Sequence, residues 1–409
     1  MRAPWAAPSG LDGAGAAFES FSSLHALQFA RGGPFASTDR DTAWDHFRRS
    51  GPLLADWLWN HRFSPATPAP YPVPGLGLSP PLPGSDRVVF LNGRFEARLS
   101  TLSPVSGLWL RPACGLPWPL PKVDGASALV ELNRALYEEA AAIEVAGRAD
   151  AGVVEVLHLM LDPADGAMAF PRIQVHVENG ARLTLVETFQ GPHAGAYLID
   201  AVTEVHLEPG ARLQHVTVQD DGPRAIHLGG LQVRQEAGSV LSTHLFQVGA
   251  AVGRREVRLH LAGEGASAQL DGLFLTGAGR LHEHDVWIEH AAARCTSQQE
   301  VRGVARGDGR AVFVGHVRIP PNALLSETAQ RARGLLLSPE AVIDFRPELE
   351  LYTDDAKTDR SVRVEKVDPA RHPEGPEQLV GPLAHETLET LAVPGLRERV
   401  KAAVAERMG

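Results

Sequence analysis

The chain has 409 residues, and its 39 lysines and arginines against 49 aspartates and glutamates give a formal net charge of −10 at pH 7. That charge argues against non-specific binding to nucleic acid or to anionic membranes, which usually requires a basic surface. The sequence contains no apolar run long enough for a signal peptide or for a membrane-spanning helix of about 18 residues. The only cysteines, Cys114 and Cys295, are expected to be reduced thiols. We therefore expect a cytoplasmic protein that binds neither nucleic acid nor membranes.

Residues 1–85 are expected to form an N-terminal helical and proline-rich segment. Phe18, Phe21 and Leu24 follow helical spacing and predict a helix over residues 14–30. Asp39 or Asp41 would begin a second helix. The stretch 64–84 is dense in proline, which excludes a regular helix or a central strand there.

Residues 86–150 are expected to form a lead-in of mixed secondary structure. The stretch RVVFLNGRFEARL predicts strands, and it precedes a predicted helix over residues 126–142 that carries Leu129, Leu132 and Leu136 on one face.

Residues 151–365 alternate apolar and polar side chains with the period of two that is typical of strands. Two nearly identical turns, ENGARL at 178–183 and EPGARL at 208–213, are separated by 30 residues. More distantly similar turn sequences follow at 236–241 and 263–268. Self-similarity at such a period indicates stacked coils, each of which buries its apolar face against its neighbours. The sequence therefore predicts a mainly β protein with a parallel β-helix core.

Residues 366–409 are expected to form a C-terminal helical segment. Apolar residues between Leu379 and Leu391, and again from Leu396 to Val404, predict two short amphipathic helices separated at Pro394. A stack of coils leaves an open sheet edge at each end, so we expect the terminal helices to cap these edges.

One cluster of histidines suggests metal chemistry. His282 and His284 lie two residues apart on a predicted strand, and Glu289 follows, which resembles the first metal motif of cupins. The pattern lacks the accompanying glycines and a distal histidine, so solvent-facing histidines on a strand are the simpler interpretation. A cupin-like metal-binding enzyme remains an alternative. No P-loop or nucleophile elbow occurs, and we expect no catalytic residues in this chain.

Several ordered blocks in residues 289–355 carry a family resemblance. They are His290-Ala291-Ala292, Thr296-Ser297, the stretches 303–315 and 330–338, and Pro347-Glu348-Leu349-Glu350-Leu351-Tyr352 with Asp354-Asp355. Together they resemble the SufB/SufD family of iron–sulfur cluster assembly scaffolds, and the last block is most similar to the SufD branch. The resemblance covers roughly residues 125–365.

This resemblance implies a right-handed parallel β-helix with helical ends. It also implies a non-enzymatic scaffold that pairs through its β-helix with a sister scaffold of the SufB type. It further implies that an ABC-type ATPase of the SufC type docks on the C-terminal helices, and that a nascent iron–sulfur cluster forms at the scaffold interface. A divergent β-helix homodimer with another binding role is the second alternative, and the sequence does not decide between pairing with a sister chain and pairing with itself.

One segment departs from the family pattern. After the paired aspartates the family typically has Lys-Cys-Ser-His-Gly, whereas this chain has Lys357-Thr358-Asp359-Arg360-Ser361. The thiol and the imidazole that could bind iron are replaced by Thr358 and Arg360. We therefore expect the isolated chain to bind no cluster, with His290 and Cys295 as weak candidate ligands only.

Two sets of residues are predicted to contact partners. A strand that ends in a cluster of mixed charges favours an interface over a catalytic site. The predicted pairing residues are Glu348, Glu350, Asp354, Asp355, Lys357, Thr358 and Arg360. The predicted ATPase-docking residues are Leu388, Leu391, Leu396 and Arg397.

Overall fold

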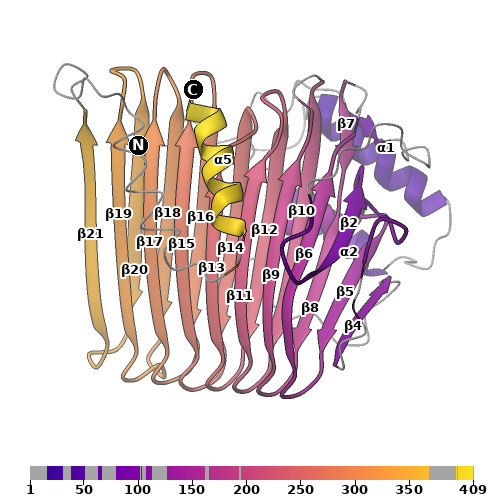
Figure 1. The fold of residues 1–409 in the computed structure, drawn as a ribbon. Helices are drawn as coiled ribbons and strands as arrows, with labels where there is room; N and C mark the ends of the chain where they lie inside the picture. The colour runs from indigo at the N-terminus through magenta and orange to yellow at the C-terminus, as the bar shows by residue number, and fades with distance from the viewer. Residues whose placement is uncertain are drawn as a thin grey trace.

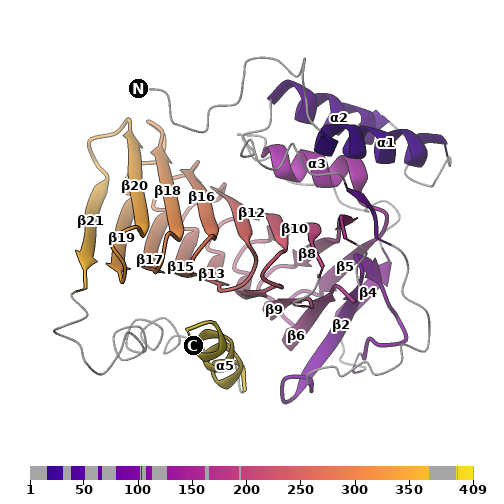
Figure 2. The same cartoon turned by 90° about the horizontal axis from the view of Figure 1, so that it is seen from above.

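A computed structural model describes residues 16–30, 38–50, 63–66, 80–101, 103, 107–112, 127–161, 165–192, 195–367, 393 and 395–408. The chain forms a right-handed parallel β-helix, as predicted, in which two long sheets face each other (Figures 1 and 2). Each coil contributes one strand to either sheet, so strands that are consecutive in the chain alternate between the sheets.

The two sheets are named A and B. In sheet A the order of neighbouring strands, from the C-terminal end of the solenoid to the N-terminal end, is β20 (Val342–Leu351), β18 (Arg310–Ile319), β16 (Leu281–His290), β14 (Val252–Leu261), β12 (Ile226–Gln235), β10 (Tyr197–Leu207), β8 (Arg172–Val177), β5 (Ala140–Val145) and β4 (Leu108–Pro112). Two short strands, β1 (Ser64–Pro65) and β7 (Ala167–Ala169), lie beside this order, and β7 pairs with β10. Sheet B contains, in the same direction, β21 (Lys357–Lys366), β19 (Glu327–Leu336), β17 (Thr296–Ala305), β15 (Ser267–Thr276), β13 (Val240–Gln247), β11 (Arg212–Asp220), β9 (Arg182–Gln190), β6 (Asp150–Leu159), β2 (Ser85–Leu91) and β3 (Arg94–Phe95).

The strand register confirms the turn repeat. Arg182 pairs with Arg212, and Arg212 pairs with Val240. The turn ENGARL therefore lies directly beside EPGARL, and the similar turn at 236–241 lies beside EPGARL in the next coil. Each turn requires a left-handed residue, which Gly180 supplies at φ 66° and Gly210 at φ 70°. Glycine adopts this conformation without the steric cost that a side chain would add.

The interior combines an apolar core with a fully buried polar seam. Along sheet B, Leu183 and Leu185 face the core, and the next inward residue, Glu187, lies in the seam. Its carboxylate lies 2.8 Å from Nε2 of His215 and 3.5 Å from Nε2 of His158. Burial alone would raise the pKa of Glu187, but hydrogen bonds from the two histidines hold that pKa well below its usual range.

The position of two histidines corrects an expectation from the sequence. His282 and His284 do share one side of β16, but their exposed fractions are 0% and 1%, so they point into the solenoid and not toward solvent. Nε2 of His282 donates to the carbonyl oxygen of Gly249 at 2.8 Å. Burial lowers the pKa of His282 to about 4 and also depresses the pKa of His284. The alternation of polar and apolar residues correctly predicted that the two histidines lie on the same face of the strand. It did not predict that this face is buried.

Three helices pack on the outer face of sheet A (Figure 2). They are α1 (Ala16–Ala30), α2 (Thr38–Ser50) and α3 (Ala128–Leu136). The first two were predicted, although α2 begins before Asp39. The third is shorter than predicted, because the chain leaves the helix after Leu136 and residues 140–145 pair with β8 as a strand. A stretch of alanines has a high helix propensity, but its pairing in the sheet overrides this preference.

The last helix, α5 (Leu396–Met408), was also predicted, and it packs on the outer face of sheet B (Figures 1 and 2). The buried residues Leu396 and Val400 join one apolar cluster with side chains from β9, β11, β13, β15 and β17. Arg399 forms an ion pair with the fully buried Glu155, which Arg87 contacts from the other side at 2.7 Å. The described helices therefore cover the faces of the sheets and not their terminal edges, contrary to our expectation. At the N-terminal end the antiparallel strands β3 and β4 occupy the edges instead.

The buried histidines should make stability depend on pH below 6.5. An unfolded histidine titrates near pH 6.5, whereas His282 and His290 remain neutral in the folded chain down to about pH 4. Between these values the unfolded state binds more protons, so stability falls as pH falls. At pH 5.5 each such histidine should reduce the free energy of unfolding by about 1.4 kcal/mol.

Urea denaturation at pH 7.5 and at pH 5.5 measures this loss. The variant His282→Gln retains a side-chain N–H for the Gly249 carbonyl and removes one titrating group, so it should lose less stability on acidification than the wild type. An equal loss in the two proteins would contradict the assignment.

Candidate protein interface

The described part of the β-helix ends in two strands that each have one unpaired edge. In sheet A, β20 pairs only with β18, and in sheet B, β21 pairs only with β19 (Figure 1, left). No other described strand pairs with either of them. A free strand edge presents unpaired backbone donors and acceptors, which native proteins usually cover or use for association. These two strands and the turn between them, residues 342–366, are called the open end below.

The open end also exposes apolar side chains that face the interior of the solenoid. Val362 pairs in register with the buried Ala332, and Val364 pairs with Gly334, so both face inward. With no further coil above them in the described chain, these two valines are 45% and 39% exposed, and Leu351 is 43% exposed. Apolar residues at such a position favour burial against a second surface.

Thr358 and Arg360 lie on the same inward side. They pair with Thr328 and Gln330, two buried residues of the preceding coil. Nη1 of Arg360 lies 3.5 Å from the carbonyl oxygen of Pro347 in β20. Arg360 thus reaches across the end of the solenoid from one sheet to the other.

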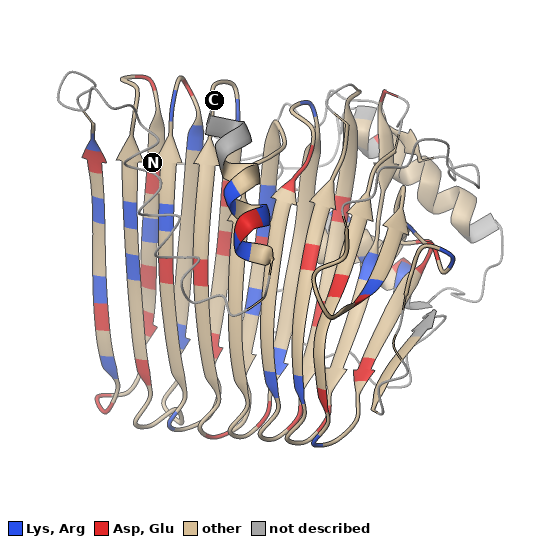
Figure 3. Ribbon diagram, viewed as in Figure 1, with Lys and Arg blue, Asp and Glu red and all other residues tan. Residues whose placement is uncertain are grey.

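Charged groups of both signs surround these residues (Figure 3). Lys357 lies 2.7 Å from Glu327, and Arg331 lies 2.8 Å from Asp359. Contact with these carboxylates raises the pKa of Lys357 and of Arg331. Because these pairs are exposed, each adds little stability to the folded chain and is available to a partner.

Sheet B carries a row of three arginines that leads to the open end. Arg302, Arg333 and Arg363 are paired in register on β17, β19 and β21. Arg302 contacts Glu300 at 3.0 Å, and Arg363 contacts Glu365, whereas Arg333 is exposed and has no ion-pair partner in the described part of the chain. Like charges directly opposite each other are unfavourable in a sheet, so this row would be stabilised by an acidic partner surface.

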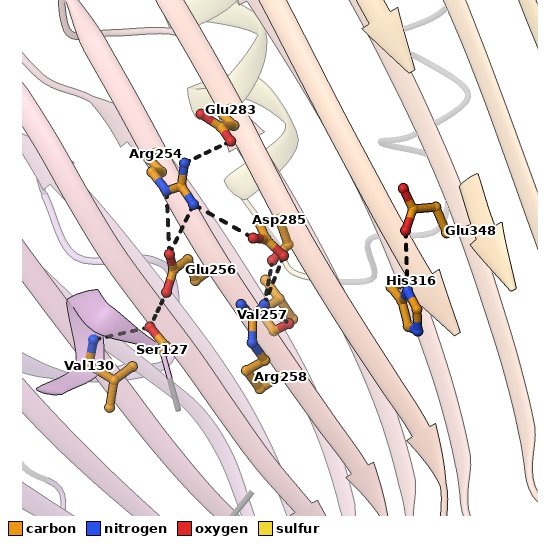
Figure 4. Close-up of polar contacts among 10 residues, drawn as sticks. All are labelled: Ser127, Val130, Arg254, Glu256, Val257, Arg258, Glu283, Asp285, His316 and Glu348. Atoms are coloured by element: carbon orange, nitrogen blue, oxygen red, sulfur yellow. Dashed lines mark hydrogen bonds and ion pairs between the residues drawn. The ribbon is translucent and has the colours of Figure 1, made fainter. Parts of the chain in front are cut away.

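The acidic residues of the predicted interface lie on sheet A and in its turn. Glu348 contacts His316 at 3.4 Å (Figure 4), and the other ring nitrogen of His316 lies 3.5 Å from Glu350. Asp354 and Asp355 are exposed in the turn between β20 and β21. All seven predicted interface residues thus lie within the open end, but Glu348 and Glu350 point to the outer face of sheet A, whereas Thr358 and Arg360 face inward from sheet B.

Further back, the outer face of sheet A carries a compact ion network (Figure 4). Arg254 lies 2.8 Å from Glu283, 3.1 Å from Glu256 and 3.6 Å from Asp285. Burial alone would lower the pKa of Arg254, but the surrounding carboxylates raise it. Glu256 in turn accepts a hydrogen bond from Ser127, the N-cap of α3. This network attaches α3 to the sheet, and we assign it a structural role.

Cys295 occupies a structural position. Three earlier coils have Ala181, Ala211 and Ala266 at the equivalent place, immediately before the first residue of the sheet B strand, and all of them are buried. Burial raises the pKa of the Cys295 thiol, whose S–H donates to the carbonyl oxygen of Gly263 at 3.4 Å. A thiol that stays protonated is a poor metal ligand.

His290 is also part of the interior. Its Nε2 lies 2.8 Å from Oγ of Ser297, and this Oγ forms a second hydrogen bond with Oγ1 of Thr328 at 2.9 Å. Burial lowers its pKa to about 4. His290 and Cys295 therefore lie inside the solenoid and not at the open end.

The cupin-like grouping does not form. His282 and His284 point inward, whereas Glu289 belongs to the outer row of sheet A, where it lies 3.0 Å from His260. The parallel β-helix also differs from a cupin barrel, so the cupin-like alternative was wrong.

Only two of the four predicted ATPase-docking residues lie among the described residues. Leu388 and Leu391 lie outside the described residues. Leu396 is fully buried against sheet B, whereas Arg397 is half-buried. In this arrangement Leu396 holds the helix on its own domain and is not available for contact with a partner.

Sequence reasoning missed Val362, Val364, Glu327 and Arg331 as members of this surface. The alternation VRV at 362–364 is typical of any half-buried strand, so by itself it does not indicate an exposed interface. Recognising these residues requires the knowledge that β21 is the last strand of the described solenoid, which strand patterning does not contain.

Comparisons with known proteins agree with this architecture. Residues 160–371 match the family model described as "SUF system FeS cluster assembly, SufBD core domain". The iron–sulfur cluster assembly protein SufD of Escherichia coli is 24% identical over 337 residues, which cover 79% of each chain. The chloroplastic protein ABCI7 of Arabidopsis thaliana is 31% identical over 46% of this chain and 40% of its own length. An iron–sulfur cluster assembly SufBD family protein of Mycobacterium tuberculosis is 27% identical over 63% of this chain and 69% of its own length.

No helix among the described residues is both long enough and apolar enough to cross a membrane.

Proposed function

Because this chain belongs to the SufBD family of iron–sulfur cluster assembly proteins, we propose that it is a SufD-like scaffold subunit that pairs through its open end with a sister scaffold of the SufB type. In this role it has no catalytic activity of its own and works in the cytoplasm.

The open end is the observation that carries this proposal. Two strand edges that no other strand of the described chain pairs with lie beside the exposed apolar residues Val362, Val364 and Leu351, and charged groups surround them. An apolar centre with a polar rim is the usual composition of a specific protein interface. The mixed charges around it suit the selection of one partner and one register.

The nascent cluster is the cargo of this assembly, and the fit of this chain's residues to it is poor. A cluster needs several thiolate or imidazole ligands that converge. At the open end Thr358 and Arg360 supply neither, and Cys295 and His290 are buried elsewhere. We propose that the partner supplies most ligands of the cluster, while this chain shapes the interface and closes one side of it.

We further propose that α5 contributes to the docking of an ABC-type ATPase of the SufC type. The apolar side of the helix is used on sheet B, so the contact would involve its outer side, where Arg397 is half-buried and Lys401 is exposed. Removal of the helix would expose Val216, Val218 and Phe246 of sheet B, so a C-terminal truncation is a poor test of docking.

Co-expression tests the proposal as a whole. The full chain, with an affinity tag at its N-terminus, is expressed with a SufB-type scaffold and a SufC-type ATPase, and the captured proteins are identified by mass spectrometry. Light scattering on the isolated chain reports self-pairing. Capture of the sister scaffold by a chain that is monomeric alone supports the proposal. A stable homodimer that captures neither protein supports the homodimer alternative instead.

Charge reversal at the open end should weaken pairing. The variant Asp354→Lys with Asp355→Lys places two cations on a surface whose partner should present complementary charge. We expect roughly tenfold weaker binding at low salt, or about 1.4 kcal/mol, and a smaller difference at high salt. Affinity for the sister scaffold is measured by biolayer interferometry at two salt concentrations.

The matched control reverses two exposed charges on internal coils, Asp165→Lys with Glu264→Lys, whose side chains are 70% and 65% exposed. This control should bind like the wild type. Equal affinity of the Asp354/Asp355 variant and the control would remove the open end as the pairing surface.

Charge reversal on the outer side of α5 should weaken ATPase capture. The variant Arg397→Glu with Lys401→Glu leaves the buried Leu396 and Val400 in place, so the fold should persist. Capture of the ATPase should fall severalfold, whereas capture of the sister scaffold should not change. The control Arg182→Glu with Arg212→Glu makes the same change on two exposed residues at the turn end of sheet B. Undiminished ATPase capture by the α5 variant would place docking elsewhere.

The isolated chain should not hold an iron–sulfur cluster. Anaerobic reconstitution with iron and sulfide is followed by absorption spectroscopy and by iron and sulfide analysis, beside the variant Cys114→Ser with Cys295→Ser. We expect no stoichiometric cluster on either protein. A cluster that forms on the wild type and is absent from the variant would show that this chain contributes thiolate ligands.

A further inference from the structure

A group of potential metal ligands lies at the opposite end of the solenoid from the open end. The group consists of Glu144 on β5, His176 on β8 and Glu178 in the turn after β8. One ligand atom of each residue lies within 4.8 Å of the ligand atoms of the other two. All three side chains are half-buried on the outer face of sheet A. Among the described residues, this is the one group of three histidine, cysteine or carboxylate side chains that converge in this way.

The register of the parallel coils creates this group. Glu144 pairs directly with His176, and Glu178 follows His176 by two residues at the start of the turn. The carboxylate of Glu178 accepts a hydrogen bond from the backbone N–H of Gly147 at 2.7 Å. This contact holds the glutamate against the preceding coil, where Glu144 lies.

His176 has an arrangement common to metal-binding histidines. Its Nε2 lies 3.0 Å from the carboxylate of Glu208 in the next turn. A histidine that binds a metal through one ring nitrogen usually donates a hydrogen bond from the other to a carboxylate, which fixes the orientation of the ring.

The ring of His176 also stacks on His206 of the next strand, with 5.3 Å between centroids and 12° between planes. The stacked rings limit rotation of the imidazole, so the site is already ordered without a metal.

We propose that Glu144, His176 and Glu178 bind one divalent transition-metal ion, with Glu208 orienting the imidazole. One nitrogen and two carboxylate oxygens suit borderline ions such as Zn²⁺, Co²⁺ or Fe²⁺. Two carboxylates favour a cation electrostatically, and three protein ligands leave further positions for water or an exogenous ligand. This site is separate from cluster assembly at the open end and does not depend on the pairing proposed above.

The test uses Co²⁺ as the probe, on the full-length chain prepared without a histidine tag. Equilibrium dialysis with metal analysis gives the stoichiometry, and the Co²⁺ absorption spectrum reports nitrogen and oxygen ligation. We expect one Co²⁺ per chain for the wild type, displaced by Zn²⁺, and no stoichiometric binding for His176→Ala. The variant Glu208→Gln should bind about 10- to 100-fold more weakly, as expected when the partner of a ligating histidine is lost.

His260→Ala is the matched control. His260 lies in the same outer row of sheet A and contacts Glu289 at 3.0 Å, but it has no such group of ligands. It should bind Co²⁺ like the wild type. Circular dichroism and urea denaturation without metal establish that each variant is folded. Absence of Co²⁺ binding by the wild type, or equal binding by the wild type and His176→Ala, would overturn the proposal.

Discussion

Parallel pairing in register between successive coils is the constraint on which the rest of this molecule depends. Each residue of a coil lies beside its equivalent in the next coil, so the sequence must offer compatible side chains at the same position again and again. The file of small buried residues that includes Ala181, Ala211, Ala266 and Cys295 satisfies this requirement in its simplest form. The pair of Glu144 and His176 and the row of arginines ending at Arg363 are consequences of the same rule on the outside.

The same rule explains why buried charge is tolerated inside the solenoid. A lone carboxylate in an apolar core would be strongly destabilising, but Glu187 is flanked by histidines from the coils on both sides. Register places these partners within hydrogen-bonding distance in every folded molecule. A shift by one residue would turn Glu187 outward and place its neighbours in the core, so the polar seam also specifies one register over its competitors.

Much of this architecture was predictable from local patterns. The period of two, the 30-residue turn repeat and the terminal helices define stacked coils, and the charge cluster after Leu351 marks a distinct end. Patterning failed where the outcome depends on contacts between distant segments. The alanines at 140–142 favour a helix until β8 lies beside them, and His282 looks like a surface residue until sheet B closes over it. The metal-ligand group was also invisible, because Glu144 and His176 are 32 positions apart and only the register joins them.

The way α5 lies on sheet B has a mechanical consequence. Its apolar side belongs to one cluster with residues of five strands, from β9 to β17, and Arg399 adds an ion pair to Glu155 on β6. A force applied to this helix is therefore shared among several coils at once and loads their hydrogen bonds in parallel. By contrast, a force applied to β21 would act on one strand pair at a time, as in unzipping. A pull on the C-terminal helix would thus reach several coils at once, without first separating β21 from β19.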